Sequence, residues 1–195
     1  MKKSFFLLTA ILALFLQSCR PVQSVFLGIR DPKVKTEKQL LKYATRKGLQ
    51  TDNNFSLRDS LTFEKYFYTI TSGKSSMAVV YDREGKMLYR YDTTGCPGPY
   101  LQYLQSICTN KQETQADSLF TDRMNDLVPF SATTNKVINT GDYDYTIVLY
   151  WARFLGMMNK KHARNYEQIL QQNHGCKIQY IKVSLDPRDF WKMRK

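Results

Sequence analysis

Hydrophobic residues are arranged in two distinct patterns in the last third of the chain. Thr146–Trp151 is apolar without alternation, which favours a strand buried on both faces, as in a parallel sheet, and Cys176–Asp186 is a second β-rich run. Between them, Leu155–Gln172 carries apolar residues at helical spacing, and Gly175 marks its end. Strand, helix and strand within about 40 residues predict one βαβ unit.

A β-hairpin is predicted near the middle of the chain. Two β-rich runs, Met77–Tyr81 and Met87–Tyr91, enclose a polar turn in which Gly85 supplies the positive φ that such turns require. A helix over Tyr100–Ile107 follows, with Pro99 suited to its first position.

Three further helices are predicted from apolar spacing. The first covers Thr36–Lys47, with Thr36 placed for the N-cap and Gly48 as its stop. The second covers Ser60–Tyr68, after a polar loop that begins near Thr51. The third covers Ala116–Val128 and ends at Pro129, and a short strand at 136–139 is predicted in the loop that follows it.

The N-terminus has the pattern of a secretory signal. Lys2 and Lys3 precede an uncharged apolar run, Phe5–Leu16, and Cys19 follows. A run of about 12 residues is too short for a membrane span. A cysteine at this place predicts a bacterial lipoprotein signal over 1–18, with Cys19 lipidated. An ordinary cleaved signal with a chance cysteine is the alternative.

The remaining chain has the length of one domain. We predict a tether over 19–32 and a single domain over 33–195. The lipid anchor predicts attachment to a membrane, and the predicted location is the bacterial cell envelope. Arg20 stands where inner-membrane lipoproteins often carry aspartate, which favours the outer membrane.

The amino-acid composition predicts a hydrophobic core and a basic surface. Hydrophobic residues make up 43% of the chain and the net charge is +12, which favours anionic lipid or acidic polymers near the surface. Lysines and arginines are scattered without a compact basic run, so no nucleic acid partner is predicted. His162 and His174 have no ligand spacing, so neither a metal site nor a cofactor is predicted.

Beyond Cys19, three cysteines remain and no C-x-x-C pair is present. A bridge between Cys96 and Cys108, which flank one predicted helix, stays open. Cys176 is interpreted as a small buried residue. Cys96, just before a predicted helix, is the candidate for a reactive thiol.

Two other groups of polar residues are given structural roles. The loop acids of "DYDY" (142–145) and "DPRD" (186–189) are expected to be solvated. His162 is expected to be a half-buried histidine with a satisfied hydrogen bond.

The segment "TIVLYWARFLGMMNKKH" resembles the active-site strand and helix of thioredoxin-like thiol–disulfide oxidoreductases, whose pattern is W-A-x-W-C-G-P-C. Trp151, Ala152 and Gly156 match that pattern, and Phe154 stands at the second tryptophan. Met157 replaces the proline. The two cysteine positions hold Leu155 and Met158. The hairpin and its following helix resemble the second half of the same fold.

The resemblance implies an α/β fold with a mixed sheet of about four strands and helices on both faces. The hairpin precedes the active-site unit, the reverse of the usual order, so the resemblance implies a circularly permuted domain with both units in one sheet. The helix over 36–47 would lead to the hairpin, and 109–140 would hold the new connection. The family's cis-proline is absent near Ser75 and Ser76.

Without a cysteine at the turn, no thiolate forms there, and disulfide exchange at that turn is excluded. The resemblance then implies a non-catalytic binding or scaffolding protein that holds an envelope protein, peptide or glycan. The candidate contact surface is the vestigial turn: Trp151, Phe154, Leu155, Gly156, Met157 and Met158. The same side chains would serve equally well as core. The alternatives are a thiol oxidoreductase or peroxidase acting through Cys96, and a purely structural lipoprotein.

Overall fold

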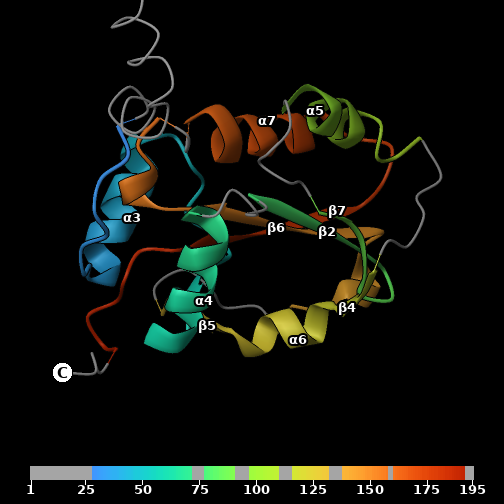
Figure 1. Cartoon of the computed structure of the whole chain (residues 1–195). Helices are drawn as coiled ribbons and strands as arrows, with labels where there is room; N and C mark the ends of the chain where they lie inside the picture. The colour runs from blue at the N-terminus through green and yellow to red at the C-terminus, as the bar shows by residue number, and fades with distance from the viewer. Residues whose placement is uncertain are drawn as a thin grey trace, which may run out of the picture.

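The computed structural model describes residues 28–71, 77–90, 97–109, 116–131, 138–157 and 160–191, which form an α/β fold (Figure 1). The predicted signal segment, Cys19, Cys96 and Met158 lie outside these residues. No helix within the described ranges is long and apolar enough to cross a membrane.

One mixed sheet forms the centre of the molecule, and in the described residues it has seven strands. In order across the sheet they are β4 (Ala116–Leu119), β3 (Lys86–Arg90), β2 (Ala78–Asp82), β6 (Tyr145–Trp151), β7 (Ile178–Ser184), β1 (Asn54–Leu57) and β5 (Leu127–Pro129). The strands β6, β7 and β1 are parallel neighbours, and the remaining pairs are antiparallel. The α/β class is therefore confirmed, whereas the estimate of about four strands is too low.

The predicted hairpin and the predicted βαβ unit lie side by side in this sheet. Strand β2 pairs antiparallel with β6, with Val79 opposite Val148 and Tyr81 opposite Thr146. Strands β6 and β7 pair in parallel along their whole length, from Tyr145 to Trp151. The expectation that both units share one sheet is thus confirmed.

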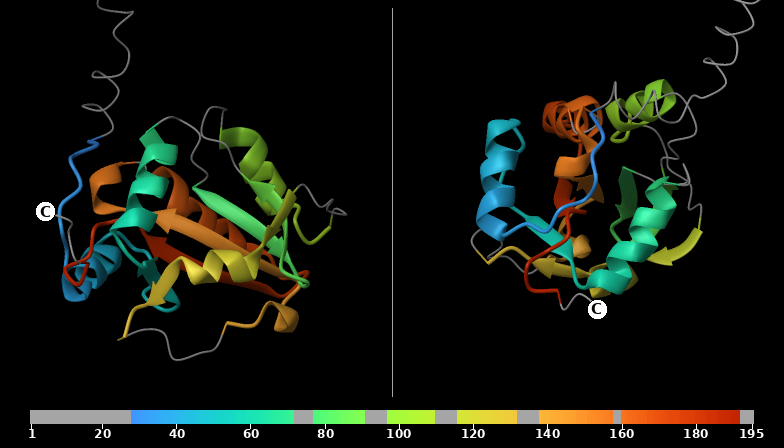
Figure 2. Two further views of the ribbon diagram at one scale, coloured as in Figure 1. Left: turned by 60° about the horizontal axis from the view of Figure 1, so that its bottom comes forward. Right: turned by 60° about the vertical axis from the view of Figure 1, so that its left-hand side comes forward.

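Helices cover both faces of the sheet (Figures 1 and 2). They are α3 (Glu37–Arg46), α4 (Ser60–Thr71), α5 (Pro97–Gln105), α6 (Phe120–Asn125) and α7 (Asn165–Gln172). Helices α5 and α7 lie on one face and α4 and α6 on the other, while α3 packs near the end of β6 where Tyr43 stacks on Trp151. The largest core cluster is built from the inner strands and from α5, α6 and α7, with α4 packed against it, while the buried face of α3 belongs to a second cluster with Trp151.

The helix α3 follows its sequence signals closely. The Thr36 side chain accepts a hydrogen bond from the backbone N–H of Gln39, and the Gln39 side chain accepts one from Thr36 N–H, which makes a capping box. Gly48 adopts φ +71, the left-handed conformation expected of a helix stop. Leu40, Tyr43 and Ala44 form its buried face.

The predicted continuous helix over Leu155–Gln172 is interrupted. A 3₁₀ turn covers Arg153–Leu155, a π-helical turn covers Lys160–Arg164, and α7 proper begins at Asn165. Gly156 has φ +54 and ψ −122, outside the helical region, so the chain changes direction there.

The predicted helix over Ala116–Val128 is wrong, because this segment contributes β4, α6 and β5 instead. Strand β4 pairs with β3 at one edge of the sheet, and β5 pairs with β1 at the other. A flat seven-stranded sheet would separate its edges by about 29 Å, but a helix as short as α6 advances only about 9 Å. The sheet must therefore curve, and α6 crosses one of its faces between the edge strands (Figure 2).

The remaining corrections concern segments whose partners are distant in sequence. Asn54–Leu57, predicted as loop, is the buried strand β1 between β7 and β5. No strand forms at the described residues 138–139. Cys176 was interpreted as a small buried residue, but it forms a disulfide with Cys108. Cys108 is therefore bonded to Cys176 and not to Cys96, the pairing that the sequence had left open. This disulfide joins the end of α5 to the start of β7.

Candidate functional site

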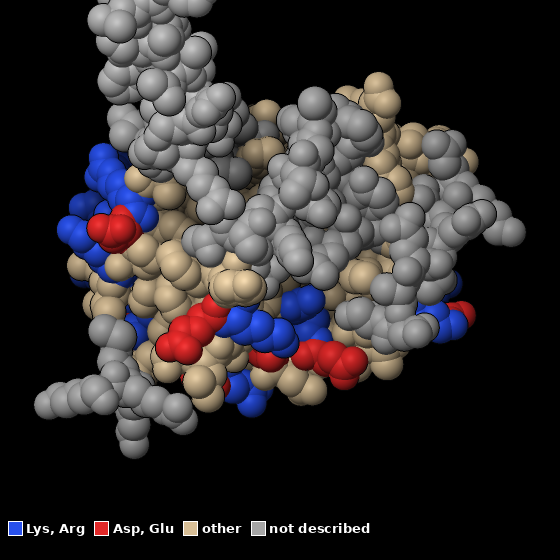
Figure 3. Space-filling view, in the orientation of Figure 1, with Lys and Arg blue, Asp and Glu red and all other residues tan. Residues whose placement is uncertain are grey.

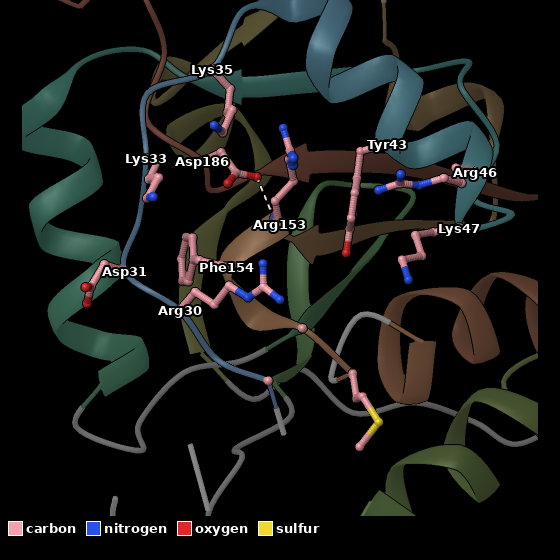
Figure 4. Close-up of a pocket in the computed structure, with 13 residues that line it drawn as sticks. Arg30, Asp31, Lys33, Lys35, Tyr43, Arg46, Lys47, Arg153, Phe154 and Asp186 are labelled. Carbon is pink, nitrogen blue, oxygen red and sulfur yellow. Dashed lines mark hydrogen bonds between the residues drawn. The ribbon is translucent and has the colours of Figure 1, made fainter. Parts of the chain in front are cut away.

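A pocket lies where the parallel strands β6 and β7 end. Ligands of α/β proteins commonly bind beyond the carboxyl ends of such strands, because the loops that follow them converge there. Here those loops begin at Ala152 and Leu185, and α3 and the segment 28–35 complete the walls. The cavity has a volume of about 710 Å³ (Figure 4), within the range of about 300–1,000 Å³ typical of small-molecule sites.

The segment that leads into α3 is part of this site. Arg30 N–H donates to the Phe154 carbonyl at 2.9 Å, and Lys35 N–H donates to the Pro187 carbonyl at 2.8 Å. A Cβ on Gly28 would lie 3.9 Å from Gly156 Cα, so the segment runs close to the turn after β6. The end of the tether predicted over 19–32 therefore touches the domain at Gly28 and Arg30.

The turn after β6 has a buried part and an open part. Trp151, Phe154 and Leu155 are 0%, 4% and 2% exposed and belong to the core. Gly156 and Met157 line the pocket, and Met157 is 50% exposed. Of the predicted apolar contact surface, the described part thus offers one methionine rather than a continuous groove.

Positive charge dominates the pocket. Six cationic residues and two carboxylates line it, a formal excess of four positive charges. Within the described residues, none of these cations has a carboxylate oxygen within ion-pair distance. Lys and Arg side chains gather over α3 at the left of Figure 3. The cations are Arg30, Lys33, Lys35, Arg46, Lys47 and Arg153.

These cations are spread over 124 positions in the sequence, from Arg30 to Arg153, so sequence reasoning described them as scattered. The feature that most of these cations share in the sequence is a place next to the end of a helix or a strand. Lys33 and Lys35 precede α3, Arg46 and Lys47 end it, and Arg153 follows a buried strand.

Tyr43 is the centre of the cationic wall. The Arg153 guanidinium lies 5.4 Å from the centroid of the Tyr43 ring, the Lys47 ammonium 5.8 Å and the Arg46 guanidinium 5.9 Å. In Figure 4 Arg153 lies on one side of the ring, with Arg46 and Lys47 on the other. The ring also stacks on Trp151, with centroids 6.1 Å apart and planes 7° apart. Tyr43 is therefore a buried aromatic support shared by three cations.

Asp186 is the buried acid of the site, at 1% exposure. Its Oδ2 accepts hydrogen bonds from Arg153 N–H at 2.7 Å and from the Ser184 hydroxyl at 3.4 Å. Burial raises the pKa of Asp186 to about 6, and these hydrogen bonds together with the charges of Arg153 and Lys35 offset only part of that effect. The expectation of solvated acids in "DPRD" is wrong for Asp186, whereas the Asp189 side chain is 49% exposed.

We expect Asp186→Asn to change how stability depends on pH. Between the ordinary value of 3.8 and about 6, the folded protein holds a proton that the unfolded chain has released, so the free energy of unfolding falls as pH rises through this window. The ionised carboxylate then costs about 3 kcal/mol near neutral pH. The asparagine side chain carries no charge at any of these pH values, so the variant lacks this cost. Its side-chain oxygen can still accept the hydrogen bond from Arg153 N–H.

Urea denaturation at a series of pH values measures this effect. The stability of Asp186→Asn relative to wild type should rise by about 3 kcal/mol between about pH 4 and pH 7. Asp189→Asn is the matched control, since that exposed acid has no comparable burial. A constant difference between the two proteins at every pH contradicts the prediction.

Of the other sequence candidates, only His162 is among the described residues, and it does not line the pocket. His162 is half-buried and its Nδ1 lies 2.8 Å from the Tyr166 hydroxyl, which confirms its predicted satisfied state. Cys96, the candidate reactive thiol, and Cys19, the candidate lipidation site, lie outside the described residues. Across the described part of the chain, no group of three His, Cys, Asp or Glu residues is arranged to hold a metal ion.

Comparison with known proteins gives no further assignment: no family model, no curated protein and no solved structure matches the chain.

Proposed function

We propose that this protein is a lipid-anchored protein of the bacterial envelope whose domain is a permuted, redox-inactive relative of thioredoxin and acts by binding. The observation that carries the proposal is the pocket itself. It lies beside the turn where a redox enzyme of that family holds its cysteines, and its lining holds no thiol but six cations, none of which has an ion-pair partner within the described residues.

The arrangement of the sheet supports the kinship with thioredoxin-like proteins. The unit β6–α7–β7 resembles the active-site half of that fold, and β2–β3–α5 resembles the other half. The two halves are neighbours through the β2–β6 pairing, in the reverse order along the chain. The connection between them supplies both edge strands, β4 and β5, beyond the family's smaller sheet.

The distribution of sulfur supports binding over catalysis. Leu155 takes one cysteine position of the turn and is buried, and Met158 takes the other. Cys108 and Cys176 are joined to each other. A thiol oxidoreductase or peroxidase would thus depend on Cys96 alone, which is the alternative that experiment must address.

Insulin reduction and peroxide reduction by the purified protein should show no turnover above background. Cys96→Ser should be indistinguishable from wild type in both assays, because thioethers and alkyl groups cannot attack a disulfide. Turnover that disappears in Cys96→Ser would replace the binding proposal with the oxidoreductase.

The binding role is tested by affinity capture from solubilised native envelopes. The wild-type chain should retain a component that Arg46→Glu/Arg153→Glu loses, since two charges in the pocket are reversed. Lys42→Glu is the control, because Lys42 lies on the same helix but does not line the pocket. Equal capture by all three proteins would argue for a structural lipoprotein without a ligand at this site.

The anchor is tested separately by mass spectrometry of the mature protein. The N-terminal peptide should begin at Cys19 and carry the added mass of acyl chains. An unmodified Cys19 peptide would indicate the ordinary cleaved signal. Density fractionation of envelopes then distinguishes the outer membrane from the inner one.

A further inference from the structure

We propose that the cationic pocket is a binding site for a phosphate-type oxyanion, held by the side chains that surround Tyr43. The inference rests on the proposed binding function and names the chemical class of its ligand. The residues assigned to the anion are Arg46, Lys47 and Arg153, with Arg30 at the opposite wall.

The first support is that no carboxylate oxygen within the described residues lies at ion-pair distance from the pocket cations. Elsewhere on the described surface, cations meet carboxylates: Arg83 lies 3.0 Å from Asp144, and Lys65 lies 3.9 Å from Asp126. The cations of the pocket do not, although one of the two carboxylates in its lining is close to them. That carboxylate, Asp186, is turned to the backbone of Arg153, and Asp31 points away from the group around Tyr43 (Figure 4).

The second support is the convergence of three cations on one aromatic ring. Arg46 and Lys47 come from the end of α3, and Arg153 comes from the turn after β6. Three like charges that share one ring repel one another, and the attraction of each for the ring offsets only part of this repulsion. An oxyanion placed among them removes the repulsion and adds charge-assisted hydrogen bonds.

The charge of the pocket, rather than the identity of its cations, favours phosphate over a single carboxylate. Two of the three residues around Tyr43 are arginines, whose planar guanidinium groups bind phosphate and carboxylate oxygens alike through paired hydrogen bonds. The formal excess of four positive charges suits a dianion better than a monoanion. A cation or a metal ion is disfavoured by the same excess of positive charge.

The dimensions of the pocket limit the ligand to a small molecule or a head group. A cavity of about 710 Å³ has the size of a site for a phosphorylated small molecule and is too small to enclose a macromolecule. Gly28, in the pocket wall, follows Cys19 by nine residues, a reach of at most about 30 Å. With Cys19 lipidated, the pocket can therefore meet phospholipid head groups as well as soluble phosphates.

Isothermal titration of the detergent-solubilised full chain tests the inference. The probes are inorganic phosphate, glycerol 3-phosphate and short-chain phosphatidic acid, with short-chain phosphatidylcholine and sodium chloride as references. Saturable binding of at least one phosphate monoester is expected. Arg46→Gln/Arg153→Gln should weaken it tenfold or more, while Lys42→Gln should leave it within about twofold.

The probes separate the two sources of the anion. Tighter binding of phosphatidic acid than of glycerol 3-phosphate would identify a lipid head group, and equal binding would identify a soluble phosphate; both support the oxyanion site. No saturable binding at millimolar concentration, or an equal loss in Lys42→Gln, overturns the inference. If the pocket variant still loses an envelope component while no phosphate binds, only this inference fails and the proposed binding function stands.

Discussion

Replacing Lys182 with methionine is expected to lower the free energy of unfolding by about 3–5 kcal/mol, because the change leaves a buried carboxylate without its cation. Lys182 lies on β7 between β6 and β1, and it is 1% exposed. Its Nζ is 3.0 Å from Glu167 Oε1, and the Glu167 side chain is 3% exposed. Asp52, at 3.4 Å, lies at the solvent side of the same group.

The geometry explains why the loss should be large. Glu167, on α7, also accepts the backbone N–H of Gln50 at 3.2 Å. Methionine matches the volume of lysine closely, so the loss reports charge rather than packing. What remains is an anion with one neutral donor in the protein interior, and burying such a group is costly.

A double-mutant cycle gives the control. Glu167→Gln keeps an acceptor for Gln50 N–H and leaves Asp52 beside Lys182, so it should cost less than Lys182→Met. Lys182→Met/Glu167→Gln should recover part of the single-variant loss, since no unpaired charge remains. Urea denaturation measures all four proteins. A loss below about 1 kcal/mol in Lys182→Met would show that the pair behaves like an exposed one.

Breaking the disulfide between Cys108 and Cys176 is expected to cost a similar amount. The bond closes a loop across a sequence separation of 68 residues, for which the loss of chain entropy in the unfolded state amounts to about 4 kcal/mol. It also reinforces an existing contact, in which the Asn173 side chain donates to the Leu104 carbonyl at 2.9 Å. Cys108→Ser/Cys176→Ser should therefore unfold at a markedly lower temperature.

Three comparisons make the result specific. Wild-type protein in reducing agent should show the same shift as Cys108→Ser/Cys176→Ser, and that variant should not respond to the reductant. Cys96→Ser should keep wild-type stability. If Cys96→Ser were destabilised and Cys176→Ser were not, the bridge would instead join Cys96 to Cys108. Calorimetry of these four proteins, with wild type and the double variant also measured in reducing agent, decides between these pairings.

Elements with a strong local signal were predictable. The signals at Thr36 and Gly48 predicted a helix over Thr36–Lys47, and the structure has α3 at Glu37–Arg46. Gly85, at φ +77, likewise marks the position of the hairpin turn. Strand β6 was predictable because its apolar run without alternation is typical of a strand buried on both faces, and β7 because its segment is rich in β-branched and aromatic residues.

Elements that depend on a distant partner were not predictable. Ala116–Leu119 and Leu127–Pro129 have helical spacing in the sequence, and they become strands only because each meets a free edge of the sheet. Asn54–Leu57 reads as a polar loop, and its parallel pairing with β7 buries it. Such pairing overrides local propensity because it satisfies the backbone and buries side chains together.

The candidate site divides in the same way. The sequence by itself determined that the turn after Trp151 lacks a redox thiol, since residue identity alone decides which side chain can become an anion. Only the tertiary structure decided that Phe154 and Leu155 are core, that Asp186 is buried, and that cations from two segments, the end of α3 and the turn after β6, meet around Tyr43. Burial and electrostatic environment arise from contacts between segments far apart in the chain, and those contacts exist only once the sheet has assembled.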